Sequence, residues 1–172
     1  MRDYSNRGVY LDLPSPSSTA GWLETGSMPA GDIRLLTENI PEESDKPYHE
    51  CSLLGDVLKE LVAGIEAILD GDSISIELDA TRIHITPKPD GECVTVRVEI
   101  MGIPDDVRGH EPDVVGRTEL VTEIYVTVRS WCDDALAVNP DLDSSEWYQE
   151  LKAALADAED ALEDAGIEEI RQ

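Results

Sequence analysis

The sequence predicts an α+β fold, in which an antiparallel sheet of about four to five strands carries helices packed on one face. Three observations support this prediction. Apolar residues recur at three- and four-residue spacing over residues 52–70, which is typical of an amphipathic helix. They alternate with polar residues over residues 73–100, which is typical of strands with one solvent-facing side. A second helical pattern follows Asp143, so the predicted strands are flanked by helices along the chain.

Two regions are distinguished along the chain. Residues 1–49 are predicted to form an extended N-terminal arm with a possible strand, and residues 50–172 an α+β domain. Apolar and polar residues alternate over residues 8–13, which indicates the strand in the arm. The pattern over residues 32–40 is ambiguous and favours a strand only weakly. Residues 41–49 are polar and contain two prolines, so we expect a loop there.

The helix over residues 52–70 has both of its ends marked in the sequence. Ser52 is a residue type that caps a helix N-terminus through its side-chain oxygen. Gly71 suits the left-handed backbone conformation that ends a helix. A broad apolar stripe indicates that this helix packs on a sheet, and its central members are Leu54, Val57, Leu58, Leu61, Ile65 and Ile68.

The alternating segment that follows is predicted to be a three-stranded antiparallel meander. Its apolar positions change parity between Leu78 and Ile83, which predicts a tight turn or bulge near Ala80. The residues from Pro87 to Gly91 form a strong turn signal before the third strand. One side of this meander is polar, so we expect that side to face solvent.

The next segment is less clearly patterned. Residues 102–117 contain three glycines and two prolines without periodicity, which predicts a long loop. Residues 119–129 are predicted to form a fourth strand, because β-branched residues alternate there with polar ones. A helical alternative stays open, in which one face carries Leu120, Ile124, Val128 and Trp131.

Two helices are predicted to complete the chain. Ser130 begins a capping-box pattern for a short helix that must end before Pro140. Asp143 is predicted to cap the last helix in the same way. The apolar face of that last helix consists of Tyr148, Leu151, Leu155, Ala158 and Leu162.

The charge of the chain excludes several classes of function. Its 172 residues include 38 acidic and 13 basic side chains, which give a net charge of −25. Such a charge repels phosphate backbones and anionic lipids, so we expect neither direct nucleic-acid binding nor membrane association. No apolar run is long enough to span a bilayer, and no secretory signal is visible. Three scattered cysteines suit no disulfide framework, and we expect a cytoplasmic location.

The acidity itself has two interpretations. Acidic residues are distributed along the whole chain, and only four of the 13 basic residues are Lys. This composition is similar to that of proteins from salt-accumulating halophiles, where concentrated KCl screens self-repulsion. The alternative is an inhibitor or immunity-type protein whose carboxylates imitate nucleic-acid phosphates. We favour adaptation to salt, because in salt-accumulating halophiles an excess of Asp and Glu is common to cytosolic proteins in general.

Motifs that would indicate an enzyme are absent. The chain contains no phosphate-binding glycine loop, no nucleophile elbow and no His-Glu-x-x-His or Cys-x-x-Cys pattern. We therefore expect no cofactor and no metal. One arrangement that could react is His84 with Cys93, which would lie on the polar face of adjacent strands, either opposite each other or with His84 shifted opposite Thr95. An imidazole beside a thiol is used by some hydrolases, so a small thiol-dependent hydrolase is an alternative.

Two further clusters carry side chains that bind metals in other proteins. The first is the sequence His49-Glu50-Cys51, at the expected start of the first helix. The second lies in the loop over residues 102–117 and could bind a divalent cation or a partner. Its members are Asp105, Asp106, Arg108, His110, Glu111 and Asp113. Chance clustering on the surface of a very acidic protein accounts for the loop cluster, and the helix dipole accounts for Glu50 at a helix start. A metal-dependent hydrolase remains a weaker alternative.

The combined observations favour a non-catalytic binding module whose partner is another protein. Two surfaces are the candidates for that contact. One is the acidic loop just described. The other is the polar face of the sheet, with His84, Cys93 and Arg97 as its central candidates.

Overall fold

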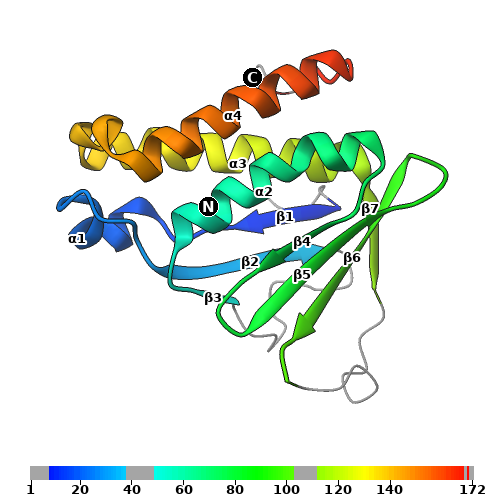
Figure 1. Ribbon diagram of the computed structural model, residues 1–172, viewed down its shortest axis with the longest axis horizontal. Coiled ribbons are helices and arrows are strands. Elements are labelled where there is room, and N and C mark those ends of the chain that lie inside the picture. Colours follow the sequence, from blue (N-terminus) through cyan, green and yellow to red (C-terminus); the bar gives the residue numbers. More distant parts are fainter. Residues whose placement is uncertain (1–7, 38–48, 103–111, 169, 171–172) are drawn as a thin grey trace.

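Three long helices gather along one side of the molecule, and two antiparallel sheets lie along the other (Figure 1). The computed structural model describes residues 8–37, 49–102, 112–168 and 170. This arrangement confirms the predicted α+β class. The long helices are α2 (Leu54–Asp70), α3 (Arg117–Val138) and α4 (Glu146–Asp164), and the short ones are η1 (Pro16–Thr19), α1 (Ala20–Leu23) and η3 (Pro140–Ser144).

The described strands form one sheet of order β1-β2-β3 and one of order β4-β5-β6-β7. Every described pairing is antiparallel. The first sheet contains β1 (Val9–Asp12), β2 (Gly31–Thr37) and β3 (His49–Cys51). The second contains β4 (Ile74–Glu77), β5 (Thr81–Pro87), β6 (Cys93–Ile100) and β7 (Asp113–Gly116).

Five of the described strands lie where the sequence predicts strands. Strands β1 and β2 lie within the segments 8–13 and 32–40, apart from Gly31 at the start of β2, and β4, β5 and β6 form the expected meander with its turn near Ala80. Residues 41–48 of the predicted loop lie outside the described residues. Strand β7 is a difference, because it occupies four residues of the segment predicted as loop. A strand that short, beginning with Asp and ending with Gly, leaves no periodic signal to read.

Helix α2 follows the prediction at its end but not at its start. Gly71 adopts the left-handed conformation with φ of 91°, as expected. The helix begins at Leu54, after an N-cap residue without a side-chain cap. Ser52 instead binds Asp79, which accepts hydrogen bonds from both the hydroxyl and the backbone N–H of Ser52. The predicted cap is therefore wrong, because the serine joins the end of β3 to the turn after β4.

The predicted fourth strand over residues 119–129 is wrong, and the helical alternative is correct. Helix α3 runs without a break from Arg117 to Val138, so the predicted cap at Ser130 is wrong as well. The physical reason is burial, since tertiary packing outweighs the β propensity of the Val- and Thr-rich segment. The face predicted by the helical alternative is buried, and it consists of Leu120, Ile124, Val128 and Trp131.

Helix α3 also buries a carboxylate that holds the N-terminal strand. Glu123 is only 4% exposed, and its Oε1 accepts a hydrogen bond from the backbone N–H of Leu11 at 3.1 Å. The same oxygen accepts a second hydrogen bond from Thr127 Oγ1 at 3.0 Å. A buried carboxylate is tolerated only with such partners. Glu123 therefore fixes β1 against α3.

The last helix has the predicted apolar face but begins later than expected. Residues 140–144 form the 3-10 helix η3, and Ser145 is the N-cap of α4, so Asp143 is not the cap. Asp143 instead accepts a hydrogen bond from Lys152 Nζ at 2.6 Å. The buried residues of α4 are those predicted, Tyr148, Leu151, Leu155, Ala158 and Leu162.

A single buried cluster unites these elements. Val9, Leu11, Leu23 and Ile33, from the region predicted as an arm, belong to the same core as the apolar stripe of α2. Helix α2 contacts α3, α4 and strands β4 and β5, so it lies at the centre of this core. Among the described residues, no helix has the length and apolar character needed to cross a membrane.

Candidate functional site

The solvent-facing side of the second sheet presents two rows of polar side chains, which we call the polar sheet face. The pairing register places Ser75, His84 and Arg97 in one row across β4, β5 and β6. The neighbouring row consists of Glu77, Arg82 and Glu99. Adjacent strands lie about 4.8 Å apart, so each row spans roughly 10 Å. The apolar side chains between these positions point to the other side, where helix α2 contacts β4 and β5.

A chain of hydrogen bonds runs through His84. Its Nδ1 lies 2.8 Å from Ser75 Oγ, and its Nε2 lies 2.7 Å from Glu99 Oε2. Both ring nitrogens are therefore engaged, which fixes the orientation of the ring. His84 is 21% exposed, so its ring edge remains in contact with water. The arrangement holds a titratable side chain in one orientation at a surface.

Arg82 links the second row into an ion-pair network. Its guanidinium contacts Glu77 Oε1 on β4, and its Nη1 lies 3.7 Å from Glu99 Oε2 on β6. The hydrogen bond from His84 lowers the pKa of the Glu99 carboxyl below its usual value of 4.5, and the charge of Arg82 contributes to the same shift. Arg97 in the first row also acts on the Glu99 carboxyl through its charge, so this face carries two arginines and two glutamates.

The lowered pKa of Glu99 gives a test of the network. A carboxyl with a lowered pKa in the folded state stabilises the protein above its unfolded pKa and loses that contribution as pH falls through the folded pKa. In a carbon-detected NMR titration at high salt, we expect Glu99 to titrate below pH 4.5 in the wild type. In His84→Ala its midpoint is expected to rise towards 4.5, because the largest cause of the shift is removed.

Asp79 is the internal control for that titration. Its pKa is lowered by hydrogen bonds from Ser52 and does not involve His84. Its midpoint is therefore expected to stay below 3.8 in both proteins. An unchanged Glu99 midpoint in His84→Ala would show that the hydrogen bond to His84 does not hold this carboxylate in solution.

Three side chains of this face are hydrogen-bonded in the order Ser75, His84, Glu99. A serine, an imidazole and a carboxylate in hydrogen-bonded order are the parts of a nucleophile with its base. Here, however, Ser75 meets Nδ1 on an exposed strand surface, and acyl transfer also needs preorganised donors for an oxyanion. The groups beside the imidazole are the charged side chains of Arg82, Arg97 and Glu99. Such a surface offers donors and acceptors in fixed positions to a polar partner.

The register separates two residues that the sequence suggested as neighbours. His84 pairs with Arg97, whereas Cys93 pairs with Gly116 of β7. Both predicted alignments, with Cys93 or Thr95 opposite His84, are therefore wrong. Cys93 lies four residues from Arg97 along β6, a distance of about 13 Å. His84 thus does not contact the thiol of Cys93, and a Cys–His pair is not formed.

The predicted loop cluster is only partly described. Asp105, Asp106, Arg108, His110 and Glu111 lie outside the described residues. Asp113 is described, and it is 8% exposed in β7, on the side of the strand that also carries the buried Val115. This position does not offer the Asp113 side chain to a partner.

The other predicted metal ligands lie in a strand. His49, Glu50 and Cys51 form β3 instead of the start of a helix, so that placement is wrong. Burial raises the pKa of the Cys51 thiol to about 11, which disfavours the thiolate that a metal requires. In the part of the chain that the structure describes, no group of three or more His, Cys, Asp or Glu side chains is placed to hold a metal ion.

Sequence reasoning named His84 and Arg97 as site residues but missed the other four members of the polar sheet face, Ser75, Glu77, Arg82 and Glu99. All four lie at polar positions of strands that the sequence predicted correctly. The missing information was the register, which follows from the length of each turn. A two-residue turn at 79–80 would have paired Ser75 with His84.

Comparisons with known proteins found no similar protein. The chain matches no model of a protein family, no curated protein and no solved structure. The site must therefore be interpreted from its own geometry.

Proposed function

We propose that this protein is a non-catalytic binding module that docks a partner protein on its polar sheet face. The observation that carries the proposal is the two-row network of Ser75, His84, Arg97, Glu77, Arg82 and Glu99. Its donors and acceptors are held in place by one another, so binding a partner costs little side-chain entropy. Fixed polar groups of this kind provide specificity for a matching surface.

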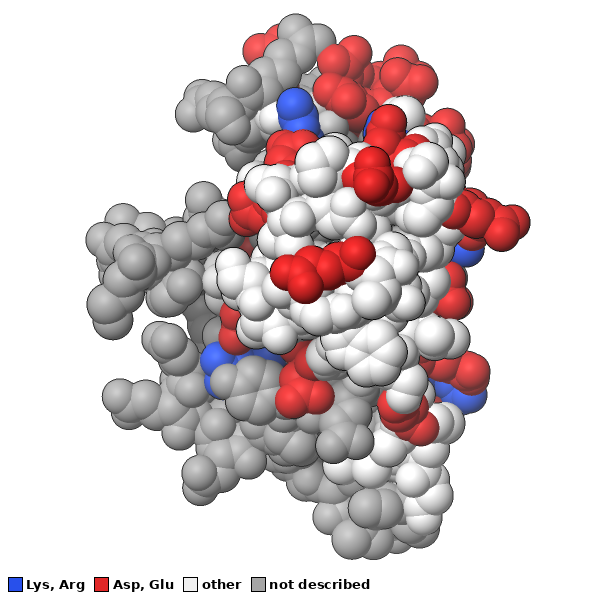
Figure 2. Space-filling view, turned by 90° about the vertical axis from the view of Figure 1, so that its left-hand side faces the viewer, with Lys and Arg blue, Asp and Glu red and all other residues white. Residues whose placement is uncertain are grey.

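The acidity of the rest of the protein surface also supports the polar sheet face as the docking face. The protein carries 25 negative charges in excess, so most of its surface repels acidic partners. Figure 2 shows this at the end of the molecule that carries α1, where Asp and Glu side chains are scattered and Lys and Arg are few. On the polar sheet face, two arginines balance two glutamates. This local balance lets another protein approach without strong repulsion.

We further propose that the acidity is an adaptation to a salt-rich cytoplasm, and that the protein binds no nucleic acid directly. The alternative is a protein that imitates nucleic acid. The exposed side of α4 is the surface that this alternative would use, since it carries Glu150, Asp157, Asp160 and Asp164. The effect of KCl on the stability of the protein separates the two interpretations. Stabilisation by KCl favours adaptation to salt, and full stability at low salt favours imitation of nucleic acid.

Arg97→Glu tests the proposed docking face, because it puts a negative charge opposite His84 and beside the balanced network. Arg129→Glu is the matched control, since Arg129 is an exposed arginine on α3 and the change of net charge is the same. We expect the wild type and Arg129→Glu to retain the same partner from an extract of the source cells. We expect Arg97→Glu to capture at least tenfold less of that partner. The reason is that an opposed charge in an interface costs about 1.4 kcal/mol or more.

The measurement is quantitative cross-linking and mass spectrometry of the captured protein, with circular dichroism to show that both variants fold. Equal capture by all three proteins would contradict the proposed face. Equal loss in both variants would show that net charge alone governs the capture.

A further inference from the structure

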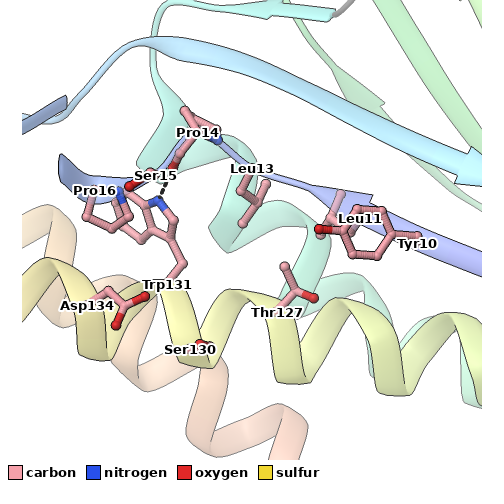
Figure 3. Close-up of a pocket in the computed structure, with 10 residues that line it drawn as sticks. All are labelled: Tyr10, Leu11, Leu13, Pro14, Ser15, Pro16, Thr127, Ser130, Trp131 and Asp134. Atoms are coloured by element: carbon pink, nitrogen blue, oxygen red, sulfur yellow. Dashed lines mark hydrogen bonds between the residues drawn. The ribbon is translucent and has the colours of Figure 1, made fainter. Parts of the chain in front are cut away.

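A pocket of about 220 Å³ lies between strand β1 and helix α3, apart from the polar sheet face (Figure 3). The segment that follows β1 forms one wall, with Leu13, Pro14 and Pro16. Successive turns of α3 form the other wall, with Thr127, Trp131 and Asp134. The space suits a small molecule or a single side chain.

The walls of this pocket are held in place by hydrogen bonds at both ends. Trp131 Nε1 donates a hydrogen bond to the carbonyl oxygen of Pro14 at 2.9 Å, which ties the two walls together (Figure 3). At the other end, Glu123 fixes the backbone of Leu11 and the hydroxyl of Thr127, and both residues line the pocket. The proline rings add stiffness because they fix the backbone. A ligand therefore meets a preformed site.

The lining combines polar groups with hydrocarbon, and among the described residues that form it Asp134 is the only charged side chain. Asp134 is exposed, so its carboxylate can meet the charged end of a ligand at the rim. Leu13, Pro16 and Trp131 present hydrocarbon beside it. A complementary ligand has a short apolar body and one positive end.

We propose that this pocket binds the ammonium end and aliphatic chain of a primary alkylammonium ion. The ammonium group pairs with the Asp134 carboxylate, while the methylene groups contact the apolar wall of the pocket. The net charge of −25 raises the local concentration of cations around the molecule and favours the same class of ligand. The inference stands apart from the proposed docking face, because it uses no residue of that face.

The same chemistry has two sources, a free alkylammonium ion and the lysine side chain of another protein. Two probes distinguish them, n-butylammonium for the free ion and a lysine blocked at both backbone ends for the side chain. Tighter binding of n-butylammonium points to a free small molecule, and tighter binding of the blocked lysine points to a lysine side chain. Binding of either one supports the proposed chemistry.

The test follows the indole N–H signal of Trp131 by NMR during titration with each probe. A ligand of five non-hydrogen atoms binds weakly, so we expect a Kd on the order of 1–10 mM for n-butylammonium. About 0.5 M KCl shortens the Debye length to roughly 4 Å and suppresses unspecific attraction to the acidic surface. The neutral control is n-butanol, which has the same carbon chain without the charge.

Asp134→Asn is expected to weaken binding of n-butylammonium by about tenfold or more, because a charge-assisted contact is lost. Asp133→Asn is the matched control, since Asp133 is the exposed neighbour on α3 and does not line the pocket. It is expected to bind like the wild type. Equal binding of n-butanol, an equal effect of the two substitutions, or no saturable shift with either cationic probe would overturn the proposal.

Discussion

Glu123→Ala is expected to lower the free energy of unfolding by about 3 kcal/mol. The substitution leaves the buried N–H of Leu11 and the hydroxyl of Thr127 without their acceptor, and an unsatisfied buried donor costs about 1–3 kcal/mol. It also opens a cavity between β1 and α3, which adds to the loss. For a chain of this size, the melting temperature is expected to fall by roughly 6–12 °C.

Two variants separate the hydrogen bonds from the charge in that experiment. Glu123→Gln keeps a carbonyl oxygen in the position of the acceptor, so we expect most of the stability to be retained. Glu66→Ala is the matched control, because Glu66 is exposed on α2 and the change of net charge is the same. Its effect is expected to stay within about 0.5 kcal/mol. Chemical denaturation of all three variants measures the differences, and equal effects at positions 123 and 66 would contradict the role assigned to Glu123.

Raising KCl from about 0.1 M to about 3 M is expected to stabilise the protein by about 3 kcal/mol, which corresponds to roughly 10 °C in melting temperature. The screening length falls from about 10 Å to below 3 Å over this range, so repulsion among 25 excess negative charges is largely removed. Helix α4 contributes to the effect. Asp160 and Asp164 lie in its last turns, where the helix dipole disfavours negative charge.

A neutralised variant tests this cause directly. Replacing Asp157, Asp160 and Asp164 by Asn changes the net charge from −25 to −22. We expect the triple variant to be more stable than the wild type at low salt and to approach it at high salt. Thermal melts followed by circular dichroism compare the two. A wild type that is fully stable at low salt, with no response to KCl, would count against adaptation to salt and favour imitation of nucleic acid.

The parts of the fold that were predictable are those in which local pattern and burial agree. The stripes of α2 and α4 repeat over four or more turns, and the six central residues predicted for α2 and the five predicted for α4 are buried. Helix α3 was not predictable in this way, because Val121, Val126 and Val128 favour a strand locally while packing imposes a helix. Glu123 increased the difficulty, since a carboxylate at an inner position is the opposite of what an apolar stripe predicts.

The site was predictable only at the level of the face. Alternation placed His84 and Arg97 on the polar side of the sheet, as observed. Their contacts depend on register, and a shift of one strand relative to the next changes every neighbour. The predicted partner Cys93 lies too far along β6, whereas Ser75 and Glu99 are brought together by two separate turns. No local pattern in the sequence specifies both turns together.

The bond between Leu11 and Glu123 has a consequence for the order in which the chain folds. The two residues are 112 positions apart in the sequence. A ribosome that adds about 5–20 residues per second needs roughly 6–20 s to reach Glu123 after Leu11 has been made. During that time the small sheet of β1, β2 and β3 has no α3 to cover it. Until the last third of the chain has been made, Val9 and Leu11 therefore lack the helix that covers them in the folded protein.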